Sequence, residues 1–342
     1  MRQIAALLCA GVIGALLLLP PLAIALELEP TLASPVIVVS QDGSGAYQEI
    51  QRAIDEAKPG DTIFIKAGSY REDVVVHSKN RLRLVGEARD RVTIHGLKRV
   101  GAFRVGKWPY GASDIEIRDL TISENGGLAV GVFNGSRILL SNIRVLGLLY
   151  VQQATGVRIE HSLIAHSETT GVSFADAEGE LTGNDIRNND YGVTISGKSS
   201  VRLTSNLIQE NLVAGVILQG GAKGELVRNT VVKNGGGILV IDNSQAELKG
   251  NIVGANKSGI QIGPDALAHL AFNAVRNDGP DYARPGDPPL PTPDLKPDSD
   301  LALDPHFVDP VAGDFRLRAD TPLVRRGDFE FLGALPPVST AQ

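Results

Sequence analysis

The chain has 342 residues and a formal net charge of −6, with 33 basic and 39 acidic residues. The charges are scattered, and since no basic block could neutralise a row of phosphates, the composition argues against nucleic acid as a partner. The 38 glycines beside only 5% aromatic residues are typical of a β-repeat protein with many tight corners and an aliphatic core.

The N-terminus has the pattern of an export signal. Residues 3–26 are uncharged, and Ala23–Ala25 provides a small-residue cleavage site, so we expect residues 1–25 to be a signal peptide. An uncleaved anchor is the alternative, because the stretch is just long enough to span a bilayer. Both options export the protein, and we expect a periplasmic or secreted location with no stable membrane span after cleavage. Cys9 is the only cysteine, so the mature chain has no disulfides.

The first predicted element after this leader is a helix over residues 47–57. Ile50, Ala53, Ile54 and Ala57 form one apolar stripe at helical spacing. We expect this helix to cover the N-terminal end of the structure that follows, because an open end would expose unpaired strand edges.

A repeat of about 22 residues occupies most of the remaining chain. A polar corner followed by aliphatic residues recurs in steps of 20 to 23 residues, at Asp119, Asn142, Ser162, Asn184, Asn206, Asn229, Asn251 and Asn273. A glycine followed by alternating apolar residues repeats with the same period, at Gly171, Gly192, Gly215, Gly237 and Gly259. Short β-patterned runs without a helical return exclude a leucine-rich repeat and predict a right-handed parallel β-helix over residues 36–283.

Alternation within one repeat predicts which side chains face the core. In the coil "YGVTISGKSSVRLTSNLIQENL" five residues should point inward, namely Val193, Ile195, Val201, Leu203 and Ile208. Three should point outward, namely Thr194, Arg202 and Thr204. We expect each corner Asn to adopt the left-handed conformation and to stack its amide on those of the neighbouring coils.

Two segments end the chain. Residues 284–300 are rich in Pro and Asp and are expected to cross the end of the solenoid as an extended segment without a core of its own. Residues 301–342 should form a C-terminal cap and tail.

One long segment resembles a known family. The run "VSQDGSGAYQEIQRAIDEAKPGDTIFIKAGSYREDVVV" followed by "LRLVGEARDRVTIHG" is similar to the opening of pectin methylesterases and related pectate-lyase-like β-helix proteins. The resemblance implies the fold, and fold alone does not give function.

The catalytic residues of that family are not found at the matching positions. Gly147 and Leu148 stand where a Gln-Asp pair would precede the "LYV" segment, and Gly171 stands at the position of the nucleophilic Asp. The Gly-Arg-Pro-Trp motif is missing, and Trp108 is the only tryptophan. We therefore expect a protein with the shape of a methylesterase but without its hydrolytic residues.

The richest polar patch spans three successive coils. His166, Glu168 and Asp190 are candidate catalytic residues, because a histidine beside carboxylates could move a proton at C5 of a uronic acid. The candidate substrate-binding residues are Tyr150, Gln152, Gln153 and Tyr191. The alternative is that all of these are ordinary solvated corner residues, because the sequence does not fix the register of the turns. The outward row beside the repeating glycine is bland, with Ser173, Thr194, Ile217, Leu239 and Gln261.

Three further patterns are weaker. Asp304-Pro305-His306 resembles a motif of alginate C5-epimerases, but it lies in the terminal cap. The acidic cluster of Asp176, Glu178 and Glu180 could hold Ca²⁺, although residues two apart on a strand line up instead of converging. His161 and His166 alone are a weak zinc pattern. No cofactor is positively indicated, and Ca²⁺ is the one ion left open.

Two functions of different classes remain. The first is binding or processing of an acidic polysaccharide or cell-envelope glycan by lyase, epimerase or esterase-like chemistry. The second is a non-catalytic binding or structural scaffold of the cell envelope. The sequence leaves the oligomeric state open.

Overall fold

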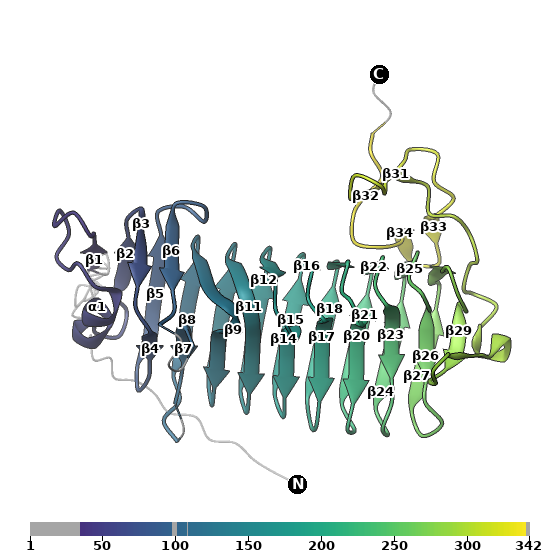
Figure 1. Cartoon of the computed structure of the whole chain (residues 1–342), viewed down its shortest axis with the longest axis horizontal. Coiled ribbons are helices and arrows are strands. Elements are labelled where there is room, and N and C mark those ends of the chain that lie inside the picture. Colours follow the sequence, from purple (N-terminus) through teal and green to yellow (C-terminus); the bar gives the residue numbers. More distant parts are fainter. Residues whose placement is uncertain (1–34, 98–100, 108, 340–342) are drawn as a thin grey trace, which may run out of the picture. The chain divides into compact units, whose positions relative to one another are not determined.

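A computed structural model describes residues 35–97, 101–107 and 109–339. The predicted signal peptide lies outside these residues. The described chain forms a parallel β-solenoid, which confirms the predicted fold (Figure 1). Each regular coil contributes one strand to an 11-stranded sheet, sheet A, and then a short and a longer strand to a second sheet, sheet B.

Neighbouring strands of sheet A belong to successive coils and pair in parallel. These strands are β1 (Val36–Val39), β2 (Thr62–Ile65), β5 (Asn80–Gly86), β8 (Ser113–Arg118), β10 (Ser136–Ser141), β12 (Thr155–Glu160), β15 (Glu178–Thr182), β18 (Ser200–Thr204), β21 (Lys223–Val227), β24 (Gln245–Lys249) and β27 (Leu267–Ala271).

Sheet B begins with β3 (Gly68–Arg71), β4 (Val74–Val76), β6 (Val92–His95), β7 (Phe103–Val105), β9 (Thr121–Phe133) and β11 (Arg144–Gln152). Its later short strands are β13 (Leu163–Ala165), β16 (Asp185–Arg187), β19 (Leu207–Gln209), β22 (Thr230–Val232), β25 (Ile252–Gly254) and β28 (Ala274–Arg276). Its later long strands are β14 (Thr170–Ala175), β17 (Tyr191–Ser196), β20 (Ala214–Gln219), β23 (Gly236–Val240), β26 (Ile260–Ile262) and β29 (Tyr282–Arg284), followed by β30 (Leu290–Pro291).

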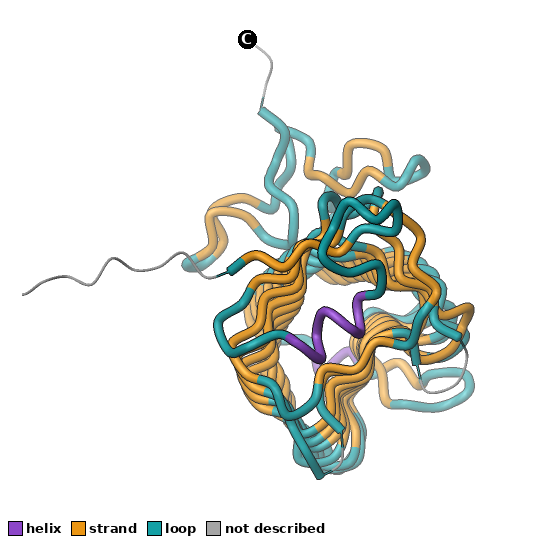
Figure 2. Tube along the Cα trace, turned by 90° about the vertical axis from the view of Figure 1, so that its left-hand side faces the viewer, coloured by secondary structure: helices purple, strands orange, loops and turns teal. Residues whose placement is uncertain are grey.

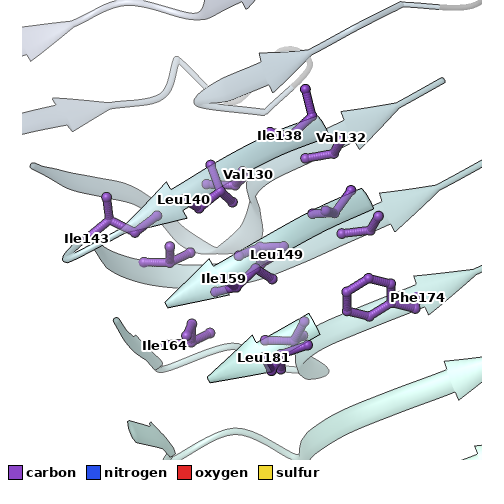
Figure 3. Close-up of a cluster of buried hydrophobic side chains, with 14 of the residues drawn as sticks. Val130, Val132, Ile138, Leu140, Ile143, Leu149, Ile159, Ile164, Phe174 and Leu181 are labelled. Carbon is purple, nitrogen blue, oxygen red and sulfur yellow. The ribbon is translucent and has the colours of Figure 1, made fainter. Parts of the chain in front are cut away.

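The core fills the inside of the coils with aliphatic side chains. All five residues predicted to point inward in the coil quoted above are buried, with exposures of 3% or less, whereas Arg202 is exposed and Thr194 and Thr204 are half-buried. Figure 3 shows like residues of successive coils, such as Leu140 and Ile159, lying against one another. This stacking supplies the stability that disulfides cannot, because each coil covers the apolar face of the next.

The corners carry an asparagine ladder, as predicted. The amide Nδ2 of each Asn donates to Oδ1 of the Asn in the next coil at 2.9 to 3.0 Å from Asn184 to Asn273. The left-handed residue is the one before each of these Asn residues, for example Ser205 and Arg228. The prediction for the Asn backbone was therefore wrong for the five Asn residues of the ladder, because the chain turns one residue earlier and leaves the Asn free to point along the stack, but it is confirmed at Asn142, which has a φ of 49°.

Two of the eight predicted corners are not part of this ladder. Asp119 and Asn142 both have positive φ, and Asn142 donates to Asp119 at 2.7 Å on the exposed side of the corner. A second ladder that the sequence analysis missed follows the next corner, at Ser167, Asn189, Asn211, Asn234, Asn256 and Asn277.

The N-terminal end is covered by helix α1 (Ile50–Glu56), shorter than the predicted range. Figure 2 shows this helix lying across the opening of the coils. Ile50, Ala53 and Ile54 are buried in the main core, and the carboxylate of Glu72 accepts hydrogen bonds from the first free backbone N–H groups of the helix. The helix is therefore fixed to the solenoid at its N-terminus.

The C-terminal end is covered by the segment predicted to cross it. Leu295, in the 3-10 helix η1 (Pro293–Leu295), packs against the main core. Buried Asp300 accepts hydrogen bonds from Asn273 and from the Tyr282 hydroxyl. The two hairpins that follow, β31 (Phe307–Asp309) with β32 (Asp314–Leu317) and β33 (Val324–Arg326) with β34 (Phe329–Phe331), pack through Leu317, Leu323 and Leu332 on the side of β25 and β28.

Candidate functional site

The three candidate catalytic residues lie together at one turn of the solenoid. His166 and Glu168 lie between β13 and β14, and Asp190 lies in the equivalent turn of the next coil, between β16 and β17. All three line one open cavity of about 400 Å³. The other lining residues are Ser167, Asn188, Asn189, Glu210 and Leu212. We call the eight residues that line this cavity the turn cluster.

The second asparagine ladder holds the turn cluster in place. Ser167 lies between His166 and Glu168, and its backbone N–H donates to Oδ1 of Asn189 at 3.0 Å. Asn189 is 3% exposed and donates in turn to Asn211 at 3.0 Å. Because these anchors are buried and hydrogen-bonded, the residues on either side of them are directed outward at fixed positions.

The backbone also sets the direction of the side chains of His166 and Glu168. His166 adopts a left-handed conformation with φ of 59°, as does Asn188 in the next coil with φ of 55°. Gly126 pairs with Ser167 through a parallel bridge, and a Cβ atom at position 126 would lie 2.6 Å from Cδ of Glu168. The glycine is therefore required for Glu168 to lie against β9.

The chemistry available here is acid and base catalysis. A histidine and two carboxylates on successive coils, about 4.8 Å apart per coil, could take a proton from one side of a bound sugar and supply one to it. His166 and Glu168 are exposed and Asp190 is half-buried, so a polymer in solution can reach all three.

None of the four candidate substrate-binding residues lines this cavity, although Tyr191 is next to it in sequence. Tyr191 follows Asp190 directly and begins β17. Tyr150 and Gln152 lie on the outer face of β11, where Tyr150 pairs with Ser173, five residues along the chain from Glu168. That offset is on the order of 15 Å along a strand, so Tyr150, Gln152 and the following Gln153 do not line the cavity.

One aromatic residue near Tyr150 was missed by the sequence analysis. The rings of Phe133 and Tyr150 pack edge to face, with centroids 6.0 Å apart, and Phe133 pairs in register with Gln152. Only the register between β9 and β11 reveals this pair. The outward row predicted from the sequence continues from Tyr150 along the later long strands of sheet B. Its members follow one another in register, in the order Tyr150, Ser173, Thr194, Ile217, Leu239 and Gln261.

A larger groove, also missed by the sequence analysis, runs along the outer face of sheet A. It has a volume of about 930 Å³ and extends from Arg137 in β10 to His269 in β27. It contains four cationic side chains, Arg137, Arg158, Arg202 and Lys223, and four carboxylates, Glu178, Glu180, Glu225 and Glu247. The groove shares no residue with the turn cluster.

Raised carboxyl pKa values occur at three buried structural positions. Burial raises the pKa of Glu72, which caps α1, and of Asp300, which ends the first ladder. Burial also raises the pKa of Asp185, whose carboxylate accepts a hydrogen bond from Gln209 at 2.9 Å. Asp185 lies on β16 and does not line the cavity.

The predicted acidic cluster does not converge. Glu178 and Glu180 follow one face of β15, while Asp176 lies in the preceding turn and accepts a hydrogen bond from the backbone N–H of Lys198. Within the part of the chain that the structure describes, no three His, Cys, Asp or Glu side chains are arranged to hold a metal ion. No helix among the same residues is both long and apolar enough to cross a bilayer.

Models of two known families match overlapping parts of the chain. A model of the right-handed β-helix region matches residues 110–275, and a pectinesterase model matches residues 36–129. The fold is thus the pectate-lyase-like right-handed parallel β-helix. The pectinesterase match ends before Gly147 and Gly171, where the catalytic residues of that family were sought.

Individual relatives cover short segments. Pectinesterase 2 of Citrus sinensis is 35% identical over 99 residues, which is 27% of this chain and 19% of the relative. A probable pectinesterase/pectinesterase inhibitor 6 of Arabidopsis thaliana is 31% identical over 114 residues, or 31% and 19% of the two chains. The chain therefore matches about a fifth of the length of these relatives.

Solved structures share the fold at low identity. The A-module of the mannuronan C-5 epimerase AlgE6 of Azotobacter vinelandii has a TM-score of 0.55 at 18% identity, over 68% of this chain and 74% of that one. Pectate lyase Pel9A also has a TM-score of 0.55, at 12% identity, over 90% and 98% of the two chains. At these identities the likeness supports the fold alone.

Proposed function

We propose that this protein binds and processes an acidic polysaccharide at the turn cluster. The observation that carries the proposal is the common cavity of His166, Glu168 and Asp190, because one histidine and two carboxylates are the groups that proton transfer at a sugar carbon requires. The polymer would lie along the solenoid axis and cross the successive coils.

A second observation supports a polysaccharide as the class of substrate. A pectinesterase model matches residues 36–129, and the relatives quoted above are pectinesterases. The reaction of this chain differs from pectin demethylation by the family mechanism, because Gly147, Leu148 and Gly171 lack the required side chains. Lyase, epimerase and other esterase-like chemistry remain within the proposal.

Activity on defined polymers tests the reaction. The purified protein is incubated with pectin, polygalacturonate and alginate, with and without Ca²⁺, while unsaturated-uronate absorbance, released methanol and exchange at C5 are followed. We expect product from one polymer, and loss of at least about 100-fold in rate in His166→Asn, Glu168→Gln and Asp190→Asn. Asparagine is chosen at position 166 because it tolerates the left-handed backbone.

A matched control separates chemistry from folding. His161 is also an exposed histidine in the left-handed conformation, with φ of 50°, one corner earlier in the same coil. His161→Asn should keep the full rate. If no polymer gives product, or if His161→Asn loses as much rate as His166→Asn, the assignment of the turn cluster is wrong.

The scaffold function is the second candidate. It is favoured by the bland row from Ser173 to Gln261 on sheet B, which offers few groups for chemistry. Binding of a polymer without product would support it, and affinity electrophoresis in gels that contain each polymer measures that binding directly.

Export is the remaining part of the proposal. It follows from residues 3–26 of the sequence and from a glycan substrate that lies outside the cytoplasm. Fractionation of expressing cells should recover a protein shortened by about 25 residues from the periplasm or the medium.

A further inference from the structure

A row of eight side chains, all of them titratable except Leu139, runs along the outer face of sheet A with one residue per coil. Its members are in register from β8 to β27, in the order Glu116, Leu139, Arg158, Glu180, Arg202, Glu225, Glu247 and His269. We call it the charge row. Its central four residues alternate in sign, and the guanidinium of Arg202 reaches Glu225 of the next coil at 2.6 Å.

The balance of charges determines what this groove can bind. Its four cations and four carboxylates would give a uniformly anionic polymer as many repulsive as attractive neighbours. Alternating charges suit a partner with the same alternation in the opposite order. Parallel strands about 4.8 Å apart set the spacing, so the partner must carry charges at that same spacing.

A second copy of the charge row meets this requirement. Consider a two-fold axis parallel to the strands and passing between β15 and β18. It places two sheet A faces against each other with the order of coils reversed. Glu180 then faces Arg202 of the second copy, and Arg158 faces Glu225 of the second copy. Farther out, Glu116 faces His269 of the second copy, and Leu139 faces Glu247.

Two further rows flank the charge row, formed by the residues two positions before and two positions after each of its members. Both rows are compatible with the same axis. On one side Glu178 faces Ser200, Arg137 faces Gln245, and Lys223 faces Gly156. On the other side the facing pairs are Thr182 with Thr204, Glu160 with Val227, Ser141 with Lys249, and Arg118 with Ala271. No like charges meet in any of the three rows.

Neighbouring positions of the axis fail. An axis one coil later, between β18 and β21, places Glu180 opposite Glu247. An axis one coil earlier, between β12 and β15, places Glu116 opposite Glu225. An axis that coincides with a strand places every charge of that strand opposite the same charge of the second copy. Like charges in direct opposition cost several kcal/mol each, so of the axis positions compared, only the one between β15 and β18 is electrostatically self-complementary.

We propose that sheet A forms a two-fold symmetric homodimer in this register. Eight strands of about five residues give each face roughly 34 Å by 16 Å, and the two faces together bury about 1,100 Å² even as flat surfaces, which is enough for a specific interface. The side chains of Arg158 and Arg202 are each 53% exposed and are long enough to enter the facing groove. The turn cluster stays accessible, because it shares no residue with the groove.

Charge reversal followed by sedimentation velocity tests the dimer. The wild-type chain should sediment as a dimer at micromolar concentration and dissociate as the NaCl concentration rises. Glu180→Arg and Arg202→Glu should each weaken dimerisation about 100-fold, because symmetry turns two attractive contacts into two repulsive ones. The double variant Glu180→Arg/Arg202→Glu should restore the dimer, since the two reversed charges face each other across the axis.

The controls distinguish the interface from effects within one chain. Arg83 continues the charge row on β5 and pairs with Glu116 at 3.3 Å, but no strand of sheet A lies opposite it in the dimer. Arg83→Glu should therefore stay dimeric. Thermal unfolding of every variant checks that the solenoid remains folded.

Three results would overturn the proposal. They are a monomeric wild type up to a few hundred micromolar, a dimer that both single variants leave intact, and a double variant that stays monomeric although its single parents are folded. A monomeric wild type that polygalacturonate retards in a gel, with retardation lost in Arg202→Glu, would assign the groove to a polysaccharide instead.

Discussion

At the scale of single residues, the buried amides of the first ladder are the sharpest test of the fold. Asn229 is 0% exposed, and its Oδ1 accepts from both the backbone N–H and the Nδ2 of Asn206. Asn229→Ala would leave these buried donors without an acceptor, so we expect a loss of about 3 kcal/mol in the free energy of unfolding. Chemical denaturation followed by circular dichroism measures it.

The control for this variant is a corner that lies on the surface. Asn142 donates to Asp119 at 2.7 Å but is exposed, so water replaces the lost contact, and Asn142→Ala should cost less than about 1 kcal/mol. Equal losses at the two positions would show that burial of the ladder is not what stabilises the stack.

The buried carboxyl group of Asp300 should make the stability of the protein depend on pH. Burial raises its pKa above the ordinary 3.8, against the opposing hydrogen bonds from Asn273 and Tyr282. The folded state therefore binds more protons than the unfolded state as pH rises from 3.8 through the raised pKa, and the free energy of unfolding falls across that window. Asp300→Asn cannot titrate, so its melting temperature should fall less steeply than that of the wild type as pH rises above 3.8. A variant with the wild-type slope would contradict the assignment.

At the scale of elements, the cap helix depends on a residue outside it. The carboxylate oxygens of Glu72 accept from the N–H groups of Ile50 and Gln51, each at 2.9 Å. Glu72→Ala should destabilise α1 by about 2 kcal/mol, visible as faster hydrogen exchange of its amides while the central coils stay protected. Glu49 is the matched control, because it occupies the N-cap position without a side-chain capping bond. If Glu49→Ala accelerates exchange as much as Glu72→Ala, capping by Glu72 is not the cause.

The elements were largely predictable because a parallel solenoid repeats one local pattern. The 22-residue period and the alternation of Val193 and Ile195 with Thr194 determine which strands stack and which side chains they bury. The backbone was predicted incorrectly at the five ladder Asn residues and correctly at Asn142, since the sequence does not show which of two adjacent residues makes the turn. The second ladder was missed because its asparagines lie in turns, where the residue is common for other reasons.

The site was predictable only where the period itself brings residues together. Glu168 and Asp190 are 22 residues apart and therefore lie in equivalent turns of successive coils. Tyr150 falls five residues farther along the coil, and its distance from the turn cluster depends on the exact strand register. The groove of sheet A depends on the register of strands from β10 to β27, which no local pattern specifies.

At the scale of the whole molecule, the solenoid presents two separate surfaces. The turn cluster lies at the corner between the short and long strands of sheet B, and the groove lies outside sheet A. A dimer through sheet A would leave one turn cluster open on each copy. A polymer long enough to reach both clusters would then bind more tightly than a short oligomer, by the gain in effective concentration. Binding constants for a series of uronate oligomers should rise steeply at a threshold length in the wild type, and without a threshold in Glu180→Arg.

The most direct test of the central claim is a crystal structure of the Glu168→Gln variant with a bound uronate oligosaccharide. The account predicts sugar density over the turn cluster, with a uronate ring in contact with His166 and Asp190. Density in the groove of sheet A, with the turn cluster open to solvent, would contradict it.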